Sequence, residues 1–153
     1  MKTKLKILAI DPGENTGYAV NEGDKCIWGL WNFKLRRDES FGFKLLRFKS
    51  KLKEIVEIED IELIVFERPA GRNAAGLISH AKFVGIIEEF GIRKKIPTKG
   101  YSPGEIKKHA TGNGNAGKPL MIKKAIQKYG YKGADDNEAD AICLLKLAIE
   151  DIM

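Results

Sequence analysis

The apolar positions in the first quarter of the chain follow the period of β-strands. Residues Lys4 to Ile10 begin by alternating lysine with apolar side chains and end wholly apolar, which is typical of a strand in the middle of a sheet. The turn-forming residues Asp11 to Gly13 then end this strand. Two more strands are predicted at Thr16 to Val20 and Lys25 to Phe33, joined by a turn over Asn21 to Asp24. The chain therefore opens with three antiparallel strands.

Helical and extended patterns alternate through the rest of the chain. Further strands are predicted at Ile61 to Phe66 and near Arg93 to Ile96. This order predicts an α/β fold, a mixed five-stranded sheet with helices on both faces, in a single domain over residues 1–153. The helices are expected at Ser40 to Ile58, Ala74 to Phe90, Pro103 to Ala110, Pro119 to Tyr129 and Asp136 to Ile149.

The composition is typical of a soluble globular protein, with 43% hydrophobic and 31% charged residues. No apolar run approaches the roughly 18 residues that a membrane-spanning helix requires. Residues Met1 to Lys6 lack the pattern of a signal peptide, so a cytoplasmic location is expected. With two cysteines, two histidines and no C-x-x-C pair, a zinc site of the Cys/His type is close to excluded. Any metal must then be held by carboxylates, which favours Mg²⁺ or Mn²⁺.

The net charge of +6 is unevenly distributed. Residues Arg93 to Lys132 contain eleven lysines and arginines and one acid, Glu105, whereas the rest of the chain is net acidic. Such a segment is typical of proteins that bind a polyanion, most commonly nucleic acid. A solvated helical face has the same composition, so charge alone leaves both interpretations open.

Three carboxylates stand where a buried element ends or begins. Asp11 and Glu67 each follow an apolar strand, and Asp140 lies within the apolar pattern of the last helix. Taken alone, each has an ordinary explanation: a turn cap, an ion pair with Arg68, and an exposed acid in a first helical turn. Together they predict one acidic cluster, because buried carboxylates need cationic partners. Two divalent ions about 4 Å apart would neutralise the cluster and serve in-line hydrolysis of a phosphodiester.

Four segments carry distinctive motifs: ILAIDPGENTGYAV (7–20), IELIVFERP (61–69), YSPGEIKKHATGNGNAGK (101–118) and DDNEADA (135–141). In this order they resemble the first strand and turn, the second-acid strand, the basic region and the acidic start of the last helix in the RuvC family of Holliday-junction resolvases. The resemblance runs across almost the whole chain. It implies an RNase H-like fold, a homodimer and magnesium-dependent cleavage of four-way DNA junctions.

The resemblance also implies roles for individual residues. Asp11, Glu67 and Asp140 match the metal-binding acids, and Lys118 matches a lysine near the scissile phosphate. Lys107 and Lys108 fall in the DNA-binding stretch. Two Mg²⁺ ions per site are expected, with Mn²⁺ as the alternative. We expect secondary DNA contacts from Lys44, Arg47 and Arg72. The main contacts are expected from the basic segment, and the full predicted set is Arg72, Lys99, Lys107, Lys108, Lys118, Lys123 and Lys124.

The chain departs from the family pattern at two places. Bacterial members commonly have an aromatic residue shortly after the second acid, where it unstacks the junction, but residues 68–73 contain none. They usually have an acid or a histidine three residues before the final acid, where this chain has Asn137. Asp136 lies on the same helical face as Asp140 and is predicted to bind metal with it, although a helix cap is also expected there. Asp135 is expected to point to solvent. The short, lysine-rich chain with the DDNEADA segment looks closer to phage versions of the family.

The helix over Ala74 to Phe90 is predicted to form the dimer interface. Its apolar residues cover more than one stripe, and its small residues allow another helix to approach closely. A two-fold dimer would supply two sites for two symmetric cuts. Burial of the helix within one protomer is the alternative.

Three other functions share parts of this pattern. An actin-like or sugar-kinase ATPase begins with a similar strand and turn, but needs roughly twice this length. A non-catalytic protein that binds branched DNA would keep the basic surface without needing Asp11, Glu67 and Asp140 together. An RNA nuclease of the YqgF type is the third, although the TGNGNAGK motif favours RuvC. Whether forks and flaps are also cut stays open.

Overall fold

The computed structural model describes residues 5–71 and 73–153. Its centre is a mixed five-stranded sheet in the order β3-β2-β1-β4-β5. Strand β1 pairs antiparallel with β2 and parallel with β4, β2 and β3 form a hairpin, and β5 is parallel with β4. The predicted mixed sheet is therefore confirmed. The strands are β1 (Ile7–Asp11), β2 (Asn15–Glu22), β3 (Lys25–Asn32), β4 (Leu63–Glu67) and β5 (Thr98–Tyr101).

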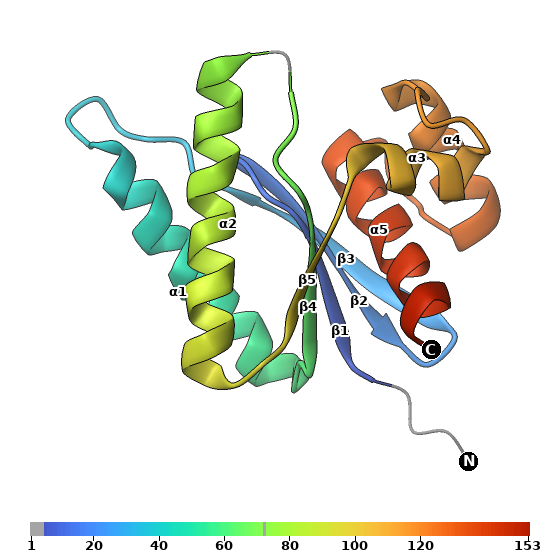
Figure 1. Cartoon of the computed structure of the whole chain (residues 1–153), viewed down its shortest axis with the longest axis horizontal. Coiled ribbons are helices and arrows are strands. Elements are labelled where there is room, and N and C mark those ends of the chain that lie inside the picture. Colours follow the sequence, from blue (N-terminus) through green and yellow to red (C-terminus); the bar gives the residue numbers. More distant parts are fainter. Residues whose placement is uncertain (1–4, 72) are drawn as a thin grey trace.

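Helices cover both faces of the sheet, as predicted (Figure 1). In the figure α1 and α2 form one layer, while α5 lies on the other face with α3 and α4 beside it. Across the residues described, the helices are too short or too polar to traverse a bilayer. The helices are α1 (Phe41–Glu59), α2 (Ala74–Lys94), α3 (Pro103–Thr111), α4 (Lys118–Tyr129) and α5 (Asp136–Ile152).

Alternate residues of the central strands build two hydrophobic cores. In β1 and β4 the buried odd-numbered residues belong to the core beneath α5, and the buried even-numbered residues belong to the core beneath α1 and α2. Successive side chains of a strand point to opposite faces, so strands buried on both faces are apolar throughout. Asp11 and Glu67 are also odd-numbered, and their side chains therefore turn to the face that α5 covers.

Helix α2 is longer than predicted, and the strand expected near Arg93 to Ile96 is wrong. The helix continues to Lys94 and ends where Lys95 adopts a left-handed conformation, with its N–H bonded to the last turn. Strand β5 begins only at Thr98. Helix C-termini favour basic residues, and a lysine in place of the usual glycine leaves the end of the helix without its strongest sequence signal.

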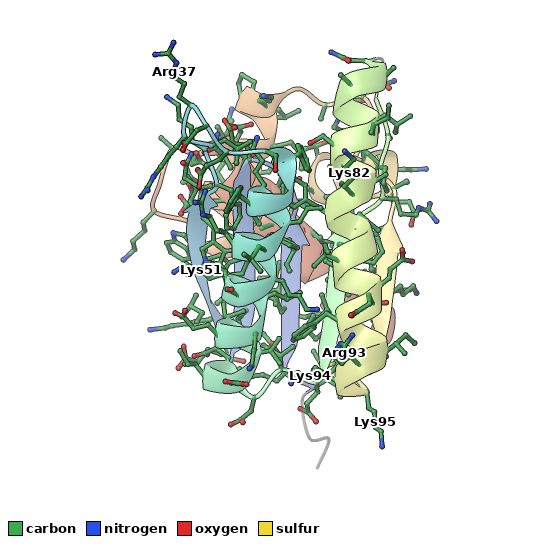
Figure 2. All side chains as sticks on the ribbon, turned by 90° about the vertical axis from the view of Figure 1, so that its left-hand side faces the viewer. Arg37, Lys51, Lys82, Arg93, Lys94 and Lys95 are labelled. Atoms are coloured by element: carbon green, nitrogen blue, oxygen red, sulfur yellow. The ribbon has the colours of Figure 1, made fainter. Side chains whose placement is uncertain are left out.

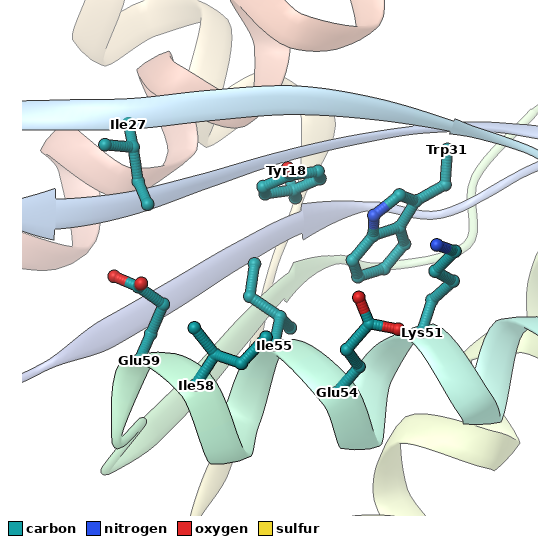
Figure 3. Close-up of a pocket in the computed structure, with 8 residues that line it drawn as sticks. All are labelled: Tyr18, Ile27, Trp31, Lys51, Glu54, Ile55, Ile58 and Glu59. Atoms are coloured by element: carbon teal, nitrogen blue, oxygen red, sulfur yellow. The ribbon is translucent and has the colours of Figure 1, made fainter.

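A small pocket opens between α1 and the β2–β3 hairpin (Figure 3). Tyr18 and Trp31 stack on its sheet side with ring centroids 4.7 Å apart, and Glu54 and Glu59 line it from α1. This pocket lies on the face of the sheet opposite to α5. It is therefore separate from the acids at the strand ends.

Candidate active site

The strand ends bring Asp11 and Glu67 side by side. Strands β1 and β4 are parallel neighbours whose register pairs Ile10 with Phe66, so the two acids occupy the next position on each strand. Their side chains share a hydrogen bond.

Gly17 allows the start of α5 to approach the same strand ends. It lies opposite Asp11 in β2, and a Cβ atom there would stand 2.0 Å from the backbone oxygen of Asn137. No side chain fits at this distance, so the crossing of helix and strand requires glycine. The close approach brings Asp136 and Asp140 near enough to Asp11 for their charges to raise its pKa.

Burial and mutual repulsion raise the pKa values of these acids. Burial is the main cause for Asp11, whose pKa lies well above its usual range, and the charges of Glu67, Asp140 and Asp136 add to it. Burial, followed by the charges of Glu67 and Asp136, raises the pKa of Asp140 to about 7. Burial also raises the pKa of Glu67, although Lys107 and the bond to Asp11 act in the opposite direction. The cluster lacks enough positive charge to balance it.

The donor set fits hard divalent cations. Four carboxylates from β1, β4 and α5 offer only oxygen atoms, which Mg²⁺ and Mn²⁺ prefer, and a cation would remove the repulsion between them. Within residues 5–71 and 73–153, no three acidic, histidine or cysteine side chains converge as a ready-made metal site.

The N-terminus of α5 is capped by Asp135 and not by Asp136. The Asp135 side chain accepts a hydrogen bond from the N–H of Glu138 at 2.9 Å, so the expectation that it points to solvent is wrong. Asp136 is the first helical residue and pairs with Lys118, with Nζ and Oδ2 3.2 Å apart. Its side chain is therefore free of a capping role.

The model of one protein family, described as crossover junction endodeoxyribonuclease RuvC, matches residues 7–149. The chain belongs to the RuvC family. The match spans both strand-end acids, the basic region and most of α5, and it confirms the enzyme class that the motifs predicted. RuvC enzymes are generally metal-dependent, which agrees with the donor set at the strand ends.

Individual RuvC proteins support this assignment. A relative named RuvC from Rhodopirellula baltica is 33% identical, with 90% of this chain and 83% of the relative covered. Another from Salinibacter ruber is 25% identical over 90% of this chain and 81% of its own length.

Two solved structures share the fold of this chain. The structure of T. thermophilus RuvC in complex with Holliday junction substrate has a TM-score of 0.77 at 19% identity, covering 94% of this chain and 92% of that one. The yeast mitochondrial Holliday junction resolvase has a TM-score of 0.67 at 16% identity, covering 95% and 78%. These similarities confirm the RNase H-like architecture that the resemblance implied.

Two of the predicted lysines lie at the acids of this RuvC chain. Lys118 pairs with Asp136, and its pKa is raised mainly by that acid and further by Asp140 and Asp11. Lys107, on α3, lowers the pKa values of Glu67 and Asp140. Both ammonium groups are therefore close enough to meet a phosphate that approaches the carboxylates.

The structure gives the other predicted DNA contacts different surroundings. Lys108 on α3 and Lys123 on α4 are exposed, and Lys124 is partly exposed. Lys99 on β5 instead donates to Asp151 at 2.7 Å, so DNA would have to compete with this ion pair.

The expected secondary contacts are also engaged within the protein or undescribed. Lys44 pairs with Glu14 at 2.7 Å, and Arg47 pairs with Glu39. Arg72 lies outside the described residues. None of these three residues gains support as a DNA contact from the geometry.

The basic segment predicted from the sequence is divided between two regions. Figure 2 shows Arg93, Lys94 and Lys95 at the C-terminal end of α2. This helix has 21 residues, about 30 Å, and runs from the end of the sheet that carries Glu67 to the opposite end (Figure 1). Helices α3 and α4 lie on the other face (Figure 1), and their residues Lys107 and Lys118 are close enough to the acids to lower the pKa of Asp140.

Helix α2 keeps an apolar stripe on its outer surface. Its inner residues, such as Phe83 and Ile87, are buried, but Leu77 and Ile78 are 39% and 58% exposed. The adjacent Ala81 is exposed as well. Part of the apolar surface of this helix therefore lies outside the core, and its role in a dimer stays a prediction.

His80 is a neighbour of the acids that the sequence reasoning missed. Its Nε2 atom donates a hydrogen bond to the backbone carbonyl of Glu67 at 2.9 Å. The histidines entered the sequence argument only as possible zinc ligands, and no motif marks this one. One sequence feature bears on this contact: Pro12, directly after β1, has no N–H with which to bond to the end of β4.

Proposed function

We propose that this protein resolves four-way DNA junctions by metal-dependent hydrolysis of phosphodiester bonds. The observation that carries the proposal is the group of carboxylates Asp11, Glu67, Asp136 and Asp140 at one end of the sheet, with Lys118 beside it. Membership of the RuvC family supports DNA as the substrate. A solved relative with the same fold is a complex with a Holliday junction, which supports the branched form of that substrate.

The proposed cofactors are two Mg²⁺ ions per site, for which Mn²⁺ can substitute. Such ions supply an activated water and stabilise the charge on the leaving 3′ oxygen. Asp11 and Glu67 would hold them from the strand ends, and Asp136 and Asp140 from α5. Since only ionised carboxylates bind metal, bound cations would lower the raised pKa values of these acids.

Lys118 is the proposed ligand of the scissile phosphate. Its side chain is 78% exposed and its pair with Asp136 is a surface ion pair, so a phosphate oxygen can replace the carboxylate at little cost. Lys107 would hold the DNA backbone next to Glu67 and Asp140. The further proposed contacts are Arg72, Lys99, Lys108, Lys123 and Lys124.

A homodimer through α2 is part of the proposal. Leu77 and Ile78 leave apolar area exposed, and an isologous interface would give the symmetric junction two equivalent sites. Analytical ultracentrifugation should show a dimer at micromolar concentration, on its own and on DNA. Ile78→Glu should shift the protein toward monomer, whereas a wild-type monomer under both conditions would exclude the dimer.

The whole of residues 1–153 is proposed to act as one nuclease domain of the phage type. The lysine-rich composition and the DDNEADA segment at residues 135–141 support this subtype. A DNA substrate is compatible with the expected cytoplasmic location, which for a phage protein is that of the bacterial host. The absence of an aromatic residue in 68–73 also implies that base unstacking at the junction does not depend on an aromatic wedge.

Cleavage of a synthetic four-way junction tests the proposed function. In Mg²⁺ the protein should make paired, symmetric nicks, while Ca²⁺ should support binding without cutting. A linear duplex with the same arm sequences and an RNA junction are the controls. Binding without cutting in Mg²⁺ and Mn²⁺ would indicate a non-catalytic branched-DNA-binding protein, and preferential cutting of RNA would indicate a YqgF-type nuclease. Either result contradicts the proposal.

A further inference from the structure

The backbone carbonyl of Glu67 points toward β1. Even-numbered residues of β4 bond to β5 instead: the N–H of Ile64 donates to Pro97 at 3.1 Å, and the N–H of Arg68, just past the strand, donates to Tyr101 at 2.8 Å. Backbone groups along a strand alternate between the two neighbouring strands. The odd-numbered Glu67 therefore presents its N–H and its carbonyl to β1.

Pro12 interrupts the β1–β4 ladder where this carbonyl needs a donor. In a parallel pair, a carbonyl accepts from the residue one position beyond its partner on the other strand. The register places Asp11 beside Glu67, so the donor would be the N–H of residue 12. Proline has none. The carbonyl at the end of β4 must find another donor or lose a hydrogen bond.

His80 supplies that donor from the opposite layer. Its Nε2 atom lies 2.9 Å from the Glu67 carbonyl oxygen, and the ring is held on α2 with limited exposure. The Glu67 side chain faces α5, whereas α2 packs on the other face. One residue of β4 is therefore held by α2 through its backbone while its carboxylate points toward Asp11 and Asp140.

We propose that His80 is a positioning residue for the active site: its hydrogen bond completes the last rung of the sheet and fixes the backbone from which the Glu67 carboxylate projects. The inference rests on the proposed function, in which Glu67 binds metal. Glu67 is the last residue of β4, where the pairing with β1 ends. A displacement of about 1 Å at a reacting group can lower a rate by roughly a hundredfold.

Two amide substitutions with different reach provide the test. In glutamine the amide nitrogen lies near the position of the histidine Nε2 atom, whereas in asparagine it lies near that of Nδ1 and falls short of the carbonyl. His80→Gln should therefore cut a four-way junction within about threefold of the wild-type single-turnover rate, and His80→Asn at least about tenfold more slowly. His80→Asn should also need more Mg²⁺ for half-maximal rate.

Measurements of protein folding and of junction binding distinguish a positioning role of His80 from a general role in the stability of the fold. Both variants should bind the junction in Ca²⁺ with wild-type affinity, and their melting temperatures should differ little from each other. Equal rates for Asn and Gln, or a slow rate explained by loss of folded protein or of junction binding, would overturn the assignment.

Calorimetric titration with Mn²⁺ alone keeps this test independent of nuclease activity. His80→Asn should bind Mn²⁺ more weakly than His80→Gln, whether or not the protein cuts DNA. A wild-type protein that binds Mn²⁺ but leaves junctions intact would contradict the proposed function only. Equal Mn²⁺ affinity in both variants and the wild type would contradict the role of His80 only.

Discussion

At the scale of single residues, the ionised acids at the strand ends lower the stability of the folded protein. Burial raises the pKa values of Asp11, Glu67 and Asp140, and their mutual repulsion adds to the effect at Asp11 and Asp140. An acid elsewhere shows the opposite behaviour, since hydrogen bonds from Arg47 and the backbone of Arg36 lower the pKa of Glu39 to about 2. Unfavourable charges gathered at one place are typical of a functional site.

Asp140→Asn should stabilise the metal-free protein at pH 8 and change it little near pH 4. The Asp140 pKa is about 7 in the folded chain, against about 3.9 when unfolded, so the folded state binds the extra proton between these values. Stability therefore falls as pH rises through this window, and the asparagine variant escapes the loss. Thermal and urea unfolding in EDTA should show a gain of roughly 2 to 4 kcal/mol in the free energy of unfolding at pH 8. A variant that is less stable than wild type at pH 8 would contradict the assigned environment.

Asp136→Asn should lose most cleavage activity and require more Mg²⁺, whereas Asn137→Ala should be milder. Asp136 carries no capping role, and its carboxylate lies near Asp140 and Lys118. Magnesium titrations of the cleavage rate measure the difference. As a control, Asp135→Ala removes the cap and should cost about 1 kcal/mol of stability with activity per folded molecule retained. If Asn137→Ala is inactive and Asp136→Asn is active, the second metal ligand on α5, next to Asp140, is Asn137.

At the scale of elements, the site depends on how closely α5 crosses β2. The backbone of Asn137 leaves no room for a side chain at Gly17. This contact determines how closely the N-terminus of α5 approaches the strand ends. The spacing between Asp11 and Gly17 in the segment DPGENTG thus has a structural reason. It places the glycine opposite the acid on the neighbouring strand.

Gly17→Ala should displace the start of α5 and lower both stability and cleavage. A Cβ atom 2.0 Å from a backbone oxygen forces the two elements apart, at a cost of at least about 2 kcal/mol in the free energy of unfolding. Unfolding curves and cleavage rates of the folded fraction measure the two effects. Gly42→Ala in α1 is the matched control, since no atom lies closer than 4.0 Å to its added Cβ. An active Gly17→Ala enzyme of normal stability would show that the helix does not need this approach.

The sequence predicts a helix or strand well where apolar residues recur with a clear period, but it predicts poorly the residue at which the element ends. The five strands and five helices were expected, and the main error arose at Lys95, whose left-handed backbone has no sequence signal comparable to glycine. The choice between Asp135 and Asp136 as helix cap depends on a one-residue shift that periodicity does not resolve. His80 escaped notice because its role depends on which way a backbone carbonyl points.

At the scale of the whole molecule, the sheet separates groups that are neighbours in the sequence. Arg93, Lys94 and Lys95 end α2 at one end of the sheet, while Lys107 and Lys118 lie beside the acids at the other. A DNA backbone that reaches the carboxylates therefore meets α3 and the start of α4 first.

Lys107→Ala combined with Lys108→Ala should weaken junction binding and flatten its salt dependence. Each lost phosphate contact should reduce the slope of log K against log salt by about 0.9. Binding titrations in Ca²⁺ at several salt concentrations measure the slope. Lys94→Ala combined with Lys95→Ala removes the same charge from the far end of α2 and should leave the slope nearly unchanged. The reverse outcome would place the DNA along α2.

The acids at the ends of β1 and β4 are proposed to perform metal-dependent cleavage, and the variants Asp11→Asn and Glu67→Gln examine this role. Each substitution keeps the size of the side chain and removes a negative metal ligand. The measurement is single-turnover cleavage of a four-way junction in Mg²⁺, with junction affinity in Ca²⁺ determined on the same preparations. We predict that both variants bind as tightly as the wild type and that neither cuts. A variant that cuts at a rate near that of the wild type would contradict the assignment of the active site.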